Sequence, residues 1–184
     1  IRPYPQELEQ TIDVGGRNIL LRPIRPEDEP AHRTFLASLQ PEDVKYRFFS
    51  YRREFSADTV ARWTQIDYDR EMAFVAVSRS DKPETLGVVR AIADPDNVRA
   101  EFAIVVRSDL KGRGLGYALM AKMIGYLRGR GTRVLFGQVL AYNERMLMLA
   151  RRLGFSVERS RDSEVYDVAL ALDDGRLLSG GQSA

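Results

Sequence analysis

A glycine-rich segment constrains this chain more than any other part of its sequence. It reads Lys-Gly-Arg-Gly-Leu-Gly-Tyr over residues 111–117, after an apolar run and before a long amphipathic pattern. Glycines between a strand and a helix let a phosphate approach the backbone N–H groups at the positive end of the helix dipole. The segment therefore predicts a site for a phosphate-bearing ligand. A turn that merely connects a strand to a helix is the alternative.

Two common nucleotide-binding motifs do not fit this segment. A Walker A loop ends in Gly-Lys followed by Ser or Thr, and neither residue type follows Gly114 or Gly116. A dinucleotide-binding fingerprint that starts at Gly112 requires a third glycine where this chain has Tyr117, and it opens the first helix of a βαβ unit. Neither motif therefore identifies the ligand.

Composition excludes several classes of function. The 184 residues suit one compact domain, and 28 Lys and Arg against 26 Asp and Glu argue against a dedicated nucleic-acid binder. The chain has no cysteine and a single histidine, His32, so we expect no disulfide, no metal site and no Ser-His-Asp triad. His32 lies at a polar helix start and is predicted to be on the surface. We expect a cytoplasmic protein without a membrane-spanning segment or a membrane partner.

Apolar periodicity predicts an α+β fold with a mixed sheet and helices on both faces. Strands are predicted at residues 18–24, 72–78, 85–93, 99–106, 133–140 and 164–172. Helices are predicted at residues 26–39, in a short stretch from 41, and at 56–65, 114–130 and 143–153. The aromatic and basic residues at 47–53 are expected to be core aromatics with solvated arginines, or else a partner surface.

The chain is predicted to contain one domain with two short flanks. Residues 1–12 carry two prolines in Arg-Pro-Tyr-Pro and indicate an extended linker or an edge strand. Residues 13–172 form the single domain, and residues 173–184 a flexible tail. Because the chain begins with Ile1, we expect it to be a segment of a longer protein.

Three parts of the chain together resemble the GNAT acyltransferases. They are the strand at 99–106, the glycine segment with Leu110 before it, and Asn143 followed by Leu-Gly-Phe at 153–155. The resemblance implies a GNAT-like, largely antiparallel central sheet with acetyl-CoA as the acyl donor. In that family the loop pattern (Gln/Arg)-x-x-Gly-x-(Gly/Ala) holds the pyrophosphate of acetyl-CoA through its amides.

The resemblance also implies which residues bind the donor. Backbone groups of Val105 and Val106 are expected to hydrogen-bond the pantetheine arm as an added strand would. The loop residues expected at the pyrophosphate are Lys111, Gly112, Arg113, Gly114, Leu115, Gly116 and Tyr117. Asn143 is expected either to contact the pantetheine arm or to cap its own helix.

A narrower resemblance concerns the segments 1–8, 21–28 and 46–49. They are similar to the acetyltransferase domains of bacterial protein lysine acetyltransferases of the Pat type. Some of these proteins fuse the domain to an acyl-CoA-synthetase-like region, which this chain lacks. Their substrates include acyl-CoA synthetases, so the resemblance implies a protein acceptor with a target lysine, such as acetyl-CoA synthetase.

Glu101 is the candidate general base. A lysine ε-amine has a pKa of about 10.4 and must lose a proton before it attacks a thioester. Glu101 is flanked by Ala100 and Phe102, and we expect apolar surroundings that make its carboxylate a stronger base. The resembled protein acetyltransferases have a glutamate there. A solvent-facing residue, or an ion pair with Arg90 or Arg99, is the alternative.

Two departures from the family pattern leave alternatives open. Lys111 stands where the loop pattern has Gln or Arg, and Ala150 stands where many members have a tyrosine that protonates the departing thiolate. Tyr142 is a candidate for that role, or a stacked core residue. A transferase for small amines and a non-catalytic module that senses acyl-CoA are the competing functions.

Overall fold

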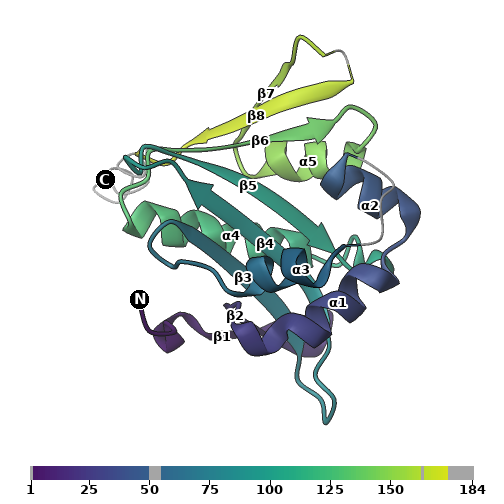
Figure 1. Cartoon of the computed structure of the whole chain (residues 1–184). Helices are drawn as coiled ribbons and strands as arrows, with labels where there is room; N and C mark the ends of the chain where they lie inside the picture. Colours follow the sequence, from purple (N-terminus) through teal and green to yellow (C-terminus); the bar gives the residue numbers. More distant parts are fainter. Residues whose placement is uncertain (1, 50–54, 163, 174–184) are drawn as a thin grey trace, which may run out of the picture.

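The computed structural model describes residues 2–49, 55–162 and 164–173. Its centre is an eight-stranded sheet in the order β1-β2-β3-β4-β5-β6-β8-β7 (Figure 1). Neighbouring strands are antiparallel except β5 and β6, which run parallel. The predicted α+β class with a mixed, largely antiparallel sheet is therefore confirmed.

The predicted elements are present with small shifts at their ends. The strands are β1 Gln10–Val14, β2 Arg17–Pro23, β3 Glu71–Ser78, β4 Thr85–Ala93, β5 Arg99–Val106, β6 Val134–Leu140, β7 Ser156–Arg159 and β8 Val165–Ala171. The α-helices are α1 Glu29–Ser38, α2 Pro41–Phe48, α3 Ala57–Thr64, α4 Leu115–Gly129 and α5 Glu144–Arg152. Strand β7 lies where no element was predicted.

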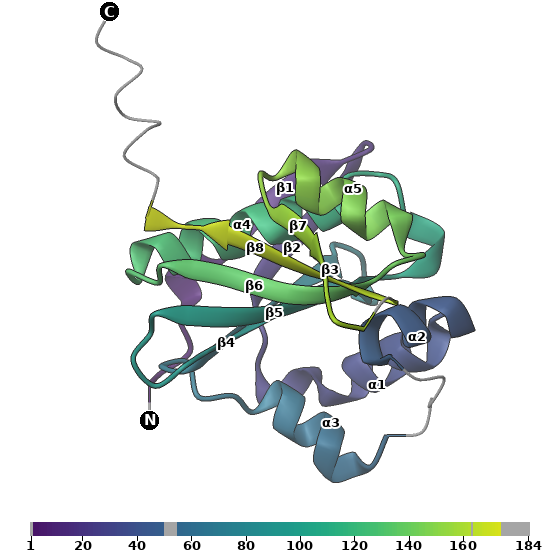
Figure 2. The same ribbon diagram turned by 90° about the horizontal axis from the view of Figure 1, so that it is seen from above.

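Helices cover both faces of the sheet (Figure 2). On one face, Val75, Val88 and Val105 pack with Phe35 and Leu39 beneath α1, α2 and α3. The core on the other face, beneath α4 and α5, includes Phe74, Val89, Phe102, Leu119 and Met123. Because side chains alternate along each strand, the two faces of the sheet form two separate cores.

The N-terminal segment contains the edge strand. Strand β1 pairs antiparallel with β2 from Gln10, so the sheet begins ahead of residue 13. The tail was expected at 173–184, and its residues from 174 onward lie outside the described residues, as do residues 50–54 of the aromatic and basic segment. Of that segment, Arg47 contacts Phe48 and lines a small enclosed void with His32 and Arg90, instead of pointing into solvent.

His32 corrects a prediction. It is 3 % exposed, because it shares the inner face of α1 with Phe35 and Leu36. Burial, reinforced by the charge of Arg90, lowers the pKa of His32 to about 4. The imidazole is therefore neutral near pH 7. Phe35 and Leu36 follow His32 by three and four residues, so they lie on the same helix face and predict that His32 points inward. The surface prediction relied instead on the polar residues at the start of the helix.

Two of the expected absences can be examined in the described part of the chain. None of its helices is both long and apolar enough to cross a membrane. It also contains no cluster of three or more His, Cys, Asp or Glu side chains that could hold a metal ion.

Candidate active site

The glycine loop between β5 and α4 exposes backbone N–H groups. Gly112 and Gly114 have φ of +78° and +92°, a conformation that L side chains rarely adopt. The N–H of Ala118 donates to the carbonyl of Gly114 at 3.1 Å, so the N–H groups of the first turn of α4 precede the helical hydrogen bonds. A Cβ atom added to Gly114 would meet no atom within 4 Å. The loop therefore fits an anionic ligand that approaches the start of α4.

Side chains from α5 flank this loop. Arg145 Nη1 lies 3.0 Å from the position of a Cβ atom on Gly112, and Arg152 lies 4.7 Å from the ring centre of Tyr117. Sequence reasoning did not single out Arg145. Its spacing of seven residues from Arg152 places both on one face of α5, and that helical periodicity was the available signal.

Strands β5 and β6 separate beyond the first residues of their pairing. They pair only at Arg99–Val134, Ala100–Leu135 and Glu101–Phe136, although β5 continues to Val106. The rest of β5 therefore has a free edge that faces the diverging strand β6. The space between residues 102–106 of β5 and 137–140 of β6 is called the cleft below. A free strand edge of this kind can accept an extended ligand as if it were a strand.

Alternation along β5 determines which backbone groups face the cleft. The N–H of Arg107 donates to the carbonyl of Leu86 in β4 at 2.8 Å. In antiparallel pairing the residues two apart bond to the same neighbour, so Val105 also bonds to β4. The N–H and C=O groups of Ile104 and Val106 face the cleft instead. Of the two residues expected at the pantetheine arm, Val106 presents its backbone groups to the cleft, whereas those of Val105 face β4.

Glu101 lies where β5 and β6 begin to separate. Its side chain is exposed, which contradicts the apolar surroundings expected from the sequence. The physical reason is strand alternation: Ala100 and Phe102 point to the opposite face and do not surround the carboxylate. Its cross-strand partner Ile92 is 53 % exposed. Glu101 is therefore accessible to a large substrate.

Neighbouring arginines have partners of their own. Arg90 donates to Glu71 at 2.5 Å and to the carbonyl of Trp63 at 2.7 Å. Burial and the charge of Arg90 lower the pKa of Arg47 to about 10, and the charge of Glu101 partly offsets that shift. Arg90 therefore has Glu71 as its ion-pair partner, and Arg47 is a cation whose charge interacts with that of Glu101.

The sequence and the fold are similar to those of known acetyltransferases. A family model described as an acetyltransferase (GNAT) domain matches residues 18–156. This chain belongs to the GNAT acetyltransferases. An acetyltransferase of Pseudomonas aeruginosa is 33% identical over 148 residues, which is 80% of each chain. The crystal structure of the GNAT domain of S. lividans PAT has a TM-score of 0.83 and 26% identity, covering 92% of this chain and 99% of that chain.

A cAMP-binding acyltransferase from Mycobacterium smegmatis shares the GNAT fold. Its TM-score is 0.62 at 23% identity, and the match covers 89% of this chain and 47% of that chain. The GNAT family takes its acyl group from acetyl-CoA, which carries a pyrophosphate. The glycine loop, with its exposed N–H groups, and the free edge of β5 fit the two parts of such a donor.

The structure places both Ala150, which stands at the usual tyrosine position, and Tyr142, the candidate for its role. Ala150 is completely buried in α5, so the usual tyrosine position belongs to the core. Tyr142 is 51 % exposed between β6 and α5 and is not a core residue. Its ring lies 6.5 Å from that of Tyr46. A hydrogen bond to Glu42 raises the pKa of Tyr46 to about 12, which weakens Tyr46 as a proton donor.

Asn143 and Lys111 have partners within the protein. The Oδ1 atom of Asn143 accepts a hydrogen bond from the N–H of Met146 at 3.3 Å, as a helix cap does. The ammonium group of Lys111 donates to the buried carboxylate of Asp43 in α2. Sequence reasoning missed Asp43, since it lies far from the loop along the chain.

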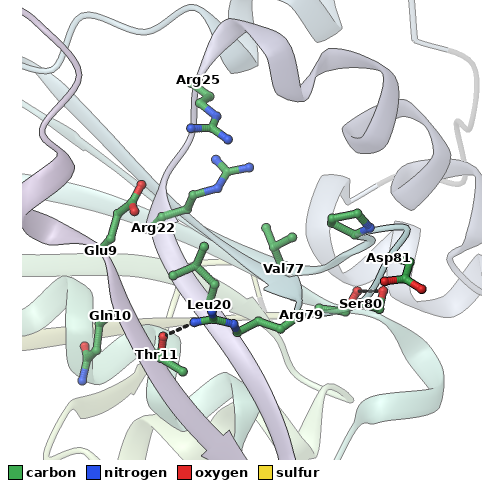
Figure 3. Close-up of a pocket in the computed structure, with 12 residues that line it drawn as sticks. Glu9, Gln10, Thr11, Leu20, Arg22, Arg25, Val77, Arg79, Ser80 and Asp81 are labelled. Carbon is green, nitrogen blue, oxygen red and sulfur yellow. Dashed lines mark hydrogen bonds between the residues drawn. The ribbon is translucent and has the colours of Figure 1, made fainter.

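An open hollow of about 710 Å³ lies near the β1 edge of the sheet, away from β5 and β6 (Figure 3). Residues of β1, β2 and β3 line it, and Arg79 donates a hydrogen bond to Thr11 at 2.8 Å across it. Its described lining does not include Glu101 or the glycine loop. The cleft between β5 and β6 is therefore the candidate active site.

Proposed function

We propose that this domain transfers the acetyl group of acetyl-CoA to a lysine ε-amine of a protein substrate. The similarity to the GNAT domain of S. lividans PAT carries this proposal, because it extends over nearly all of both chains at 26% identity. The proposed acceptor is an acyl-CoA synthetase such as acetyl-CoA synthetase. A fused acyl-CoA-synthetase-like region and a cytoplasmic location remain predictions.

The exposure of Glu101 supports a protein acceptor. Its carboxylate is solvent-exposed, and the neighbouring Ile92 offers an apolar surface at the same place. A lysine on the surface of another protein reaches such a site without entering a deep pocket. A closed acidic pocket would instead favour a small polyamine.

The residues of the chain have distinct roles in the proposed reaction. The amides from Gly112 to Tyr117 hold the pyrophosphate, and the backbone groups of Ile104 and Val106 align the pantetheine arm. The thioester supplies an activated acyl carbon. Glu101 accepts a proton from the lysine ammonium, so that the free amine attacks this carbon; the C–N bond forms, the C–S bond breaks, and the thiolate leaves with the electron pair. Tyr142 is the proposed donor of the proton that the thiolate takes up. The amide nitrogen loses its second proton as the tetrahedral intermediate collapses; this proton restores Tyr142, and Glu101 releases its own proton to solvent.

One experiment separates this proposal from its competitors. The domain is incubated with acetyl-CoA and acetyl-CoA synthetase, and modified lysines are mapped by mass spectrometry. Acetylation of a specific lysine supports the proposal. Parallel reactions with spermidine and other small amines test the second class of acceptor. Binding of acetyl-CoA without transfer to any acceptor would indicate a sensing module and contradict the proposal.

A further inference from the structure

Helix α2 is bound to the segment that follows β5 on one side of the cleft. Asp43 in α2 is 3 % exposed, and its carboxylate accepts hydrogen bonds from the ammonium of Lys111 and the hydroxyl of Ser108. The same hydroxyl of Ser108 accepts a hydrogen bond from the backbone N–H of Gln40 at 3.0 Å. A buried carboxylate requires such partners on both oxygens. The first turn of α2 is therefore fixed to the glycine loop.

Helix α2 also contacts the segment that follows β6 on the other side of the cleft. The hydroxyl of Tyr46 lies 2.6 Å from Glu42 Oε1 and 3.3 Å from the carbonyl oxygen of Tyr142. Tyr142 lies in the connection between β6 and α5. Lys111 Nζ lies 5.6 Å from the centre of the Tyr46 ring, so both contacts belong to one cluster. Figures 1 and 2 show α2 beyond the carboxyl ends of both strands.

Sheet hydrogen bonds do not fix the width of the cleft at this end. The pairing of β5 with β6 stops at Glu101 and Phe136, before either strand ends. We propose that Asp43 is a positioning residue, which holds α2 across the open end of the cleft and so links the donor loop to the acceptor side. This inference rests on the proposed function, in which the loop binds the donor and the acceptor lysine approaches Glu101 on β5, the strand against which α2 packs.

The ion pair between Asp43 and Lys111 predicts different effects on donor binding and on acceptor binding when Asp43 is replaced. Lys111 neutralises Asp43 and lies in the loop that receives the negative pyrophosphate. Replacing Asp43 with Asn keeps the side-chain shape and leaves the charge of Lys111 to the donor phosphates. We therefore expect donor binding to be retained or strengthened, while α2 loosens and acceptor binding weakens.

The test compares Asp43→Asn with Asp109→Asn as a matched control. Asp109 lies in the turn just before the glycine loop, and its carboxylate pairs with Arg107 at 2.7 Å. For Asp43→Asn we expect the Kd of acetyl-CoA by calorimetry to be unchanged or lower. We expect amide hydrogen exchange in α2 to accelerate by about tenfold or more, and the KM for acetyl-CoA synthetase to rise by about tenfold. The control should change each quantity by less than about twofold.

Tyr46→Phe provides an independent variant that removes a hydroxyl without unpairing a buried charge. It should also accelerate exchange in α2 and raise the acceptor KM, and it decides the question if Asp43→Asn does not fold. Unchanged exchange in α2 for the folded variants would overturn the proposal, as would an equal rise in donor Kd and acceptor KM. The exchange measurement needs no acceptor, so failure of acetyl transfer to the synthetase is distinguishable from failure of the α2 link.

Discussion

Arg22 at the end of β2 and Asp28 in the turn before α1 form a buried ion pair with two hydrogen bonds, of 2.7 and 2.6 Å. The carboxylate of Asp28 also accepts the N–H of Arg25 at 2.9 Å. The pair joins the sheet to the first helix of the face that carries Glu101. The orientation of α1, and of α2 after it, therefore depends on this contact.

Breaking the Arg22–Asp28 pair should strongly destabilise the domain. Asp28→Asn leaves a buried guanidinium without its counter-charge, and such losses cost about 3–5 kcal/mol of the free energy of unfolding. Glu29→Gln is the control, because the pair between Glu29 and Arg33 is partly exposed and is worth less than about 1 kcal/mol. Urea denaturation measures both. Equal losses for the two variants would show that the buried pair has no special role.

Substitution of Gly114 should abolish donor binding. Gly114→Glu places a side chain and a negative charge where the phosphate approaches the start of α4. Gly131→Glu is a matched control, because Gly131 has a φ of +80° against +92° and likewise has no atom within 4 Å of an added Cβ. Both variants carry the same backbone strain. We expect calorimetry to detect acetyl-CoA binding only in the control, and retained affinity in Gly114→Glu would refute the loop assignment.

Glu101→Gln should lower kcat/KM by about 10²- to 10⁴-fold while the Kd of acetyl-CoA stays the same. The amide keeps the shape of the side chain but does not accept the proton of the lysine ammonium. Glu84→Gln, at an exposed ion pair with Arg107, is the control. Steady-state rates and calorimetry on both variants test the role. Full turnover in Glu101→Gln at neutral pH would exclude Glu101 as the base.

His32 should make the stability of the domain depend on pH. The pKa of His32 is about 4 in the folded state, against about 6.5 for an ordinary histidine. The unfolded chain therefore binds the extra proton first, and stability falls as the pH drops from about 6.5 toward 4. Between pH 7.5 and 5 this group should cost about 2 kcal/mol.

The control for this pH dependence is His32→Leu, which lacks the titrating group. Urea denaturation of both proteins at the two pH values gives the comparison. The wild-type protein should lose more stability than the variant by about the stated amount. An identical loss in both proteins would mean that His32 titrates normally in the folded state.

Much of the fold could be predicted because its central elements have strong local patterns. Strands β4 and β5 lie at the residues predicted for them, since apolar runs are bounded there by turn residues. Strands β1 and β7 are short edge strands with mostly exposed side chains. Edge strands carry little apolar signal, so one was predicted only as an alternative and the other was missed.

The site was only partly predictable for related reasons. The glycine loop is contiguous in sequence, whereas Asp43 and Lys111 meet through tertiary packing across 68 positions. The exposure of Glu101 followed from strand alternation, which places Ala100 and Phe102 on the other face. The choice of Ile104 over Val105 depends on hydrogen-bond pairing, which a sequence pattern does not specify.

The short pairing of β5 with β6 also divides the sheet into two parts that few hydrogen bonds join. Seven residue pairs join β4 to β5 and seven join β6 to β8, but three join β5 to β6. Local opening follows the boundary with the fewest hydrogen bonds, so the sheet is weakest along this line. In the proposed function the donor bonds to the free edge of β5, so it reinforces this line and stabilises the native state as its concentration rises. The proposal therefore implies that the rigidity of the sheet depends on the supply of acyl donor.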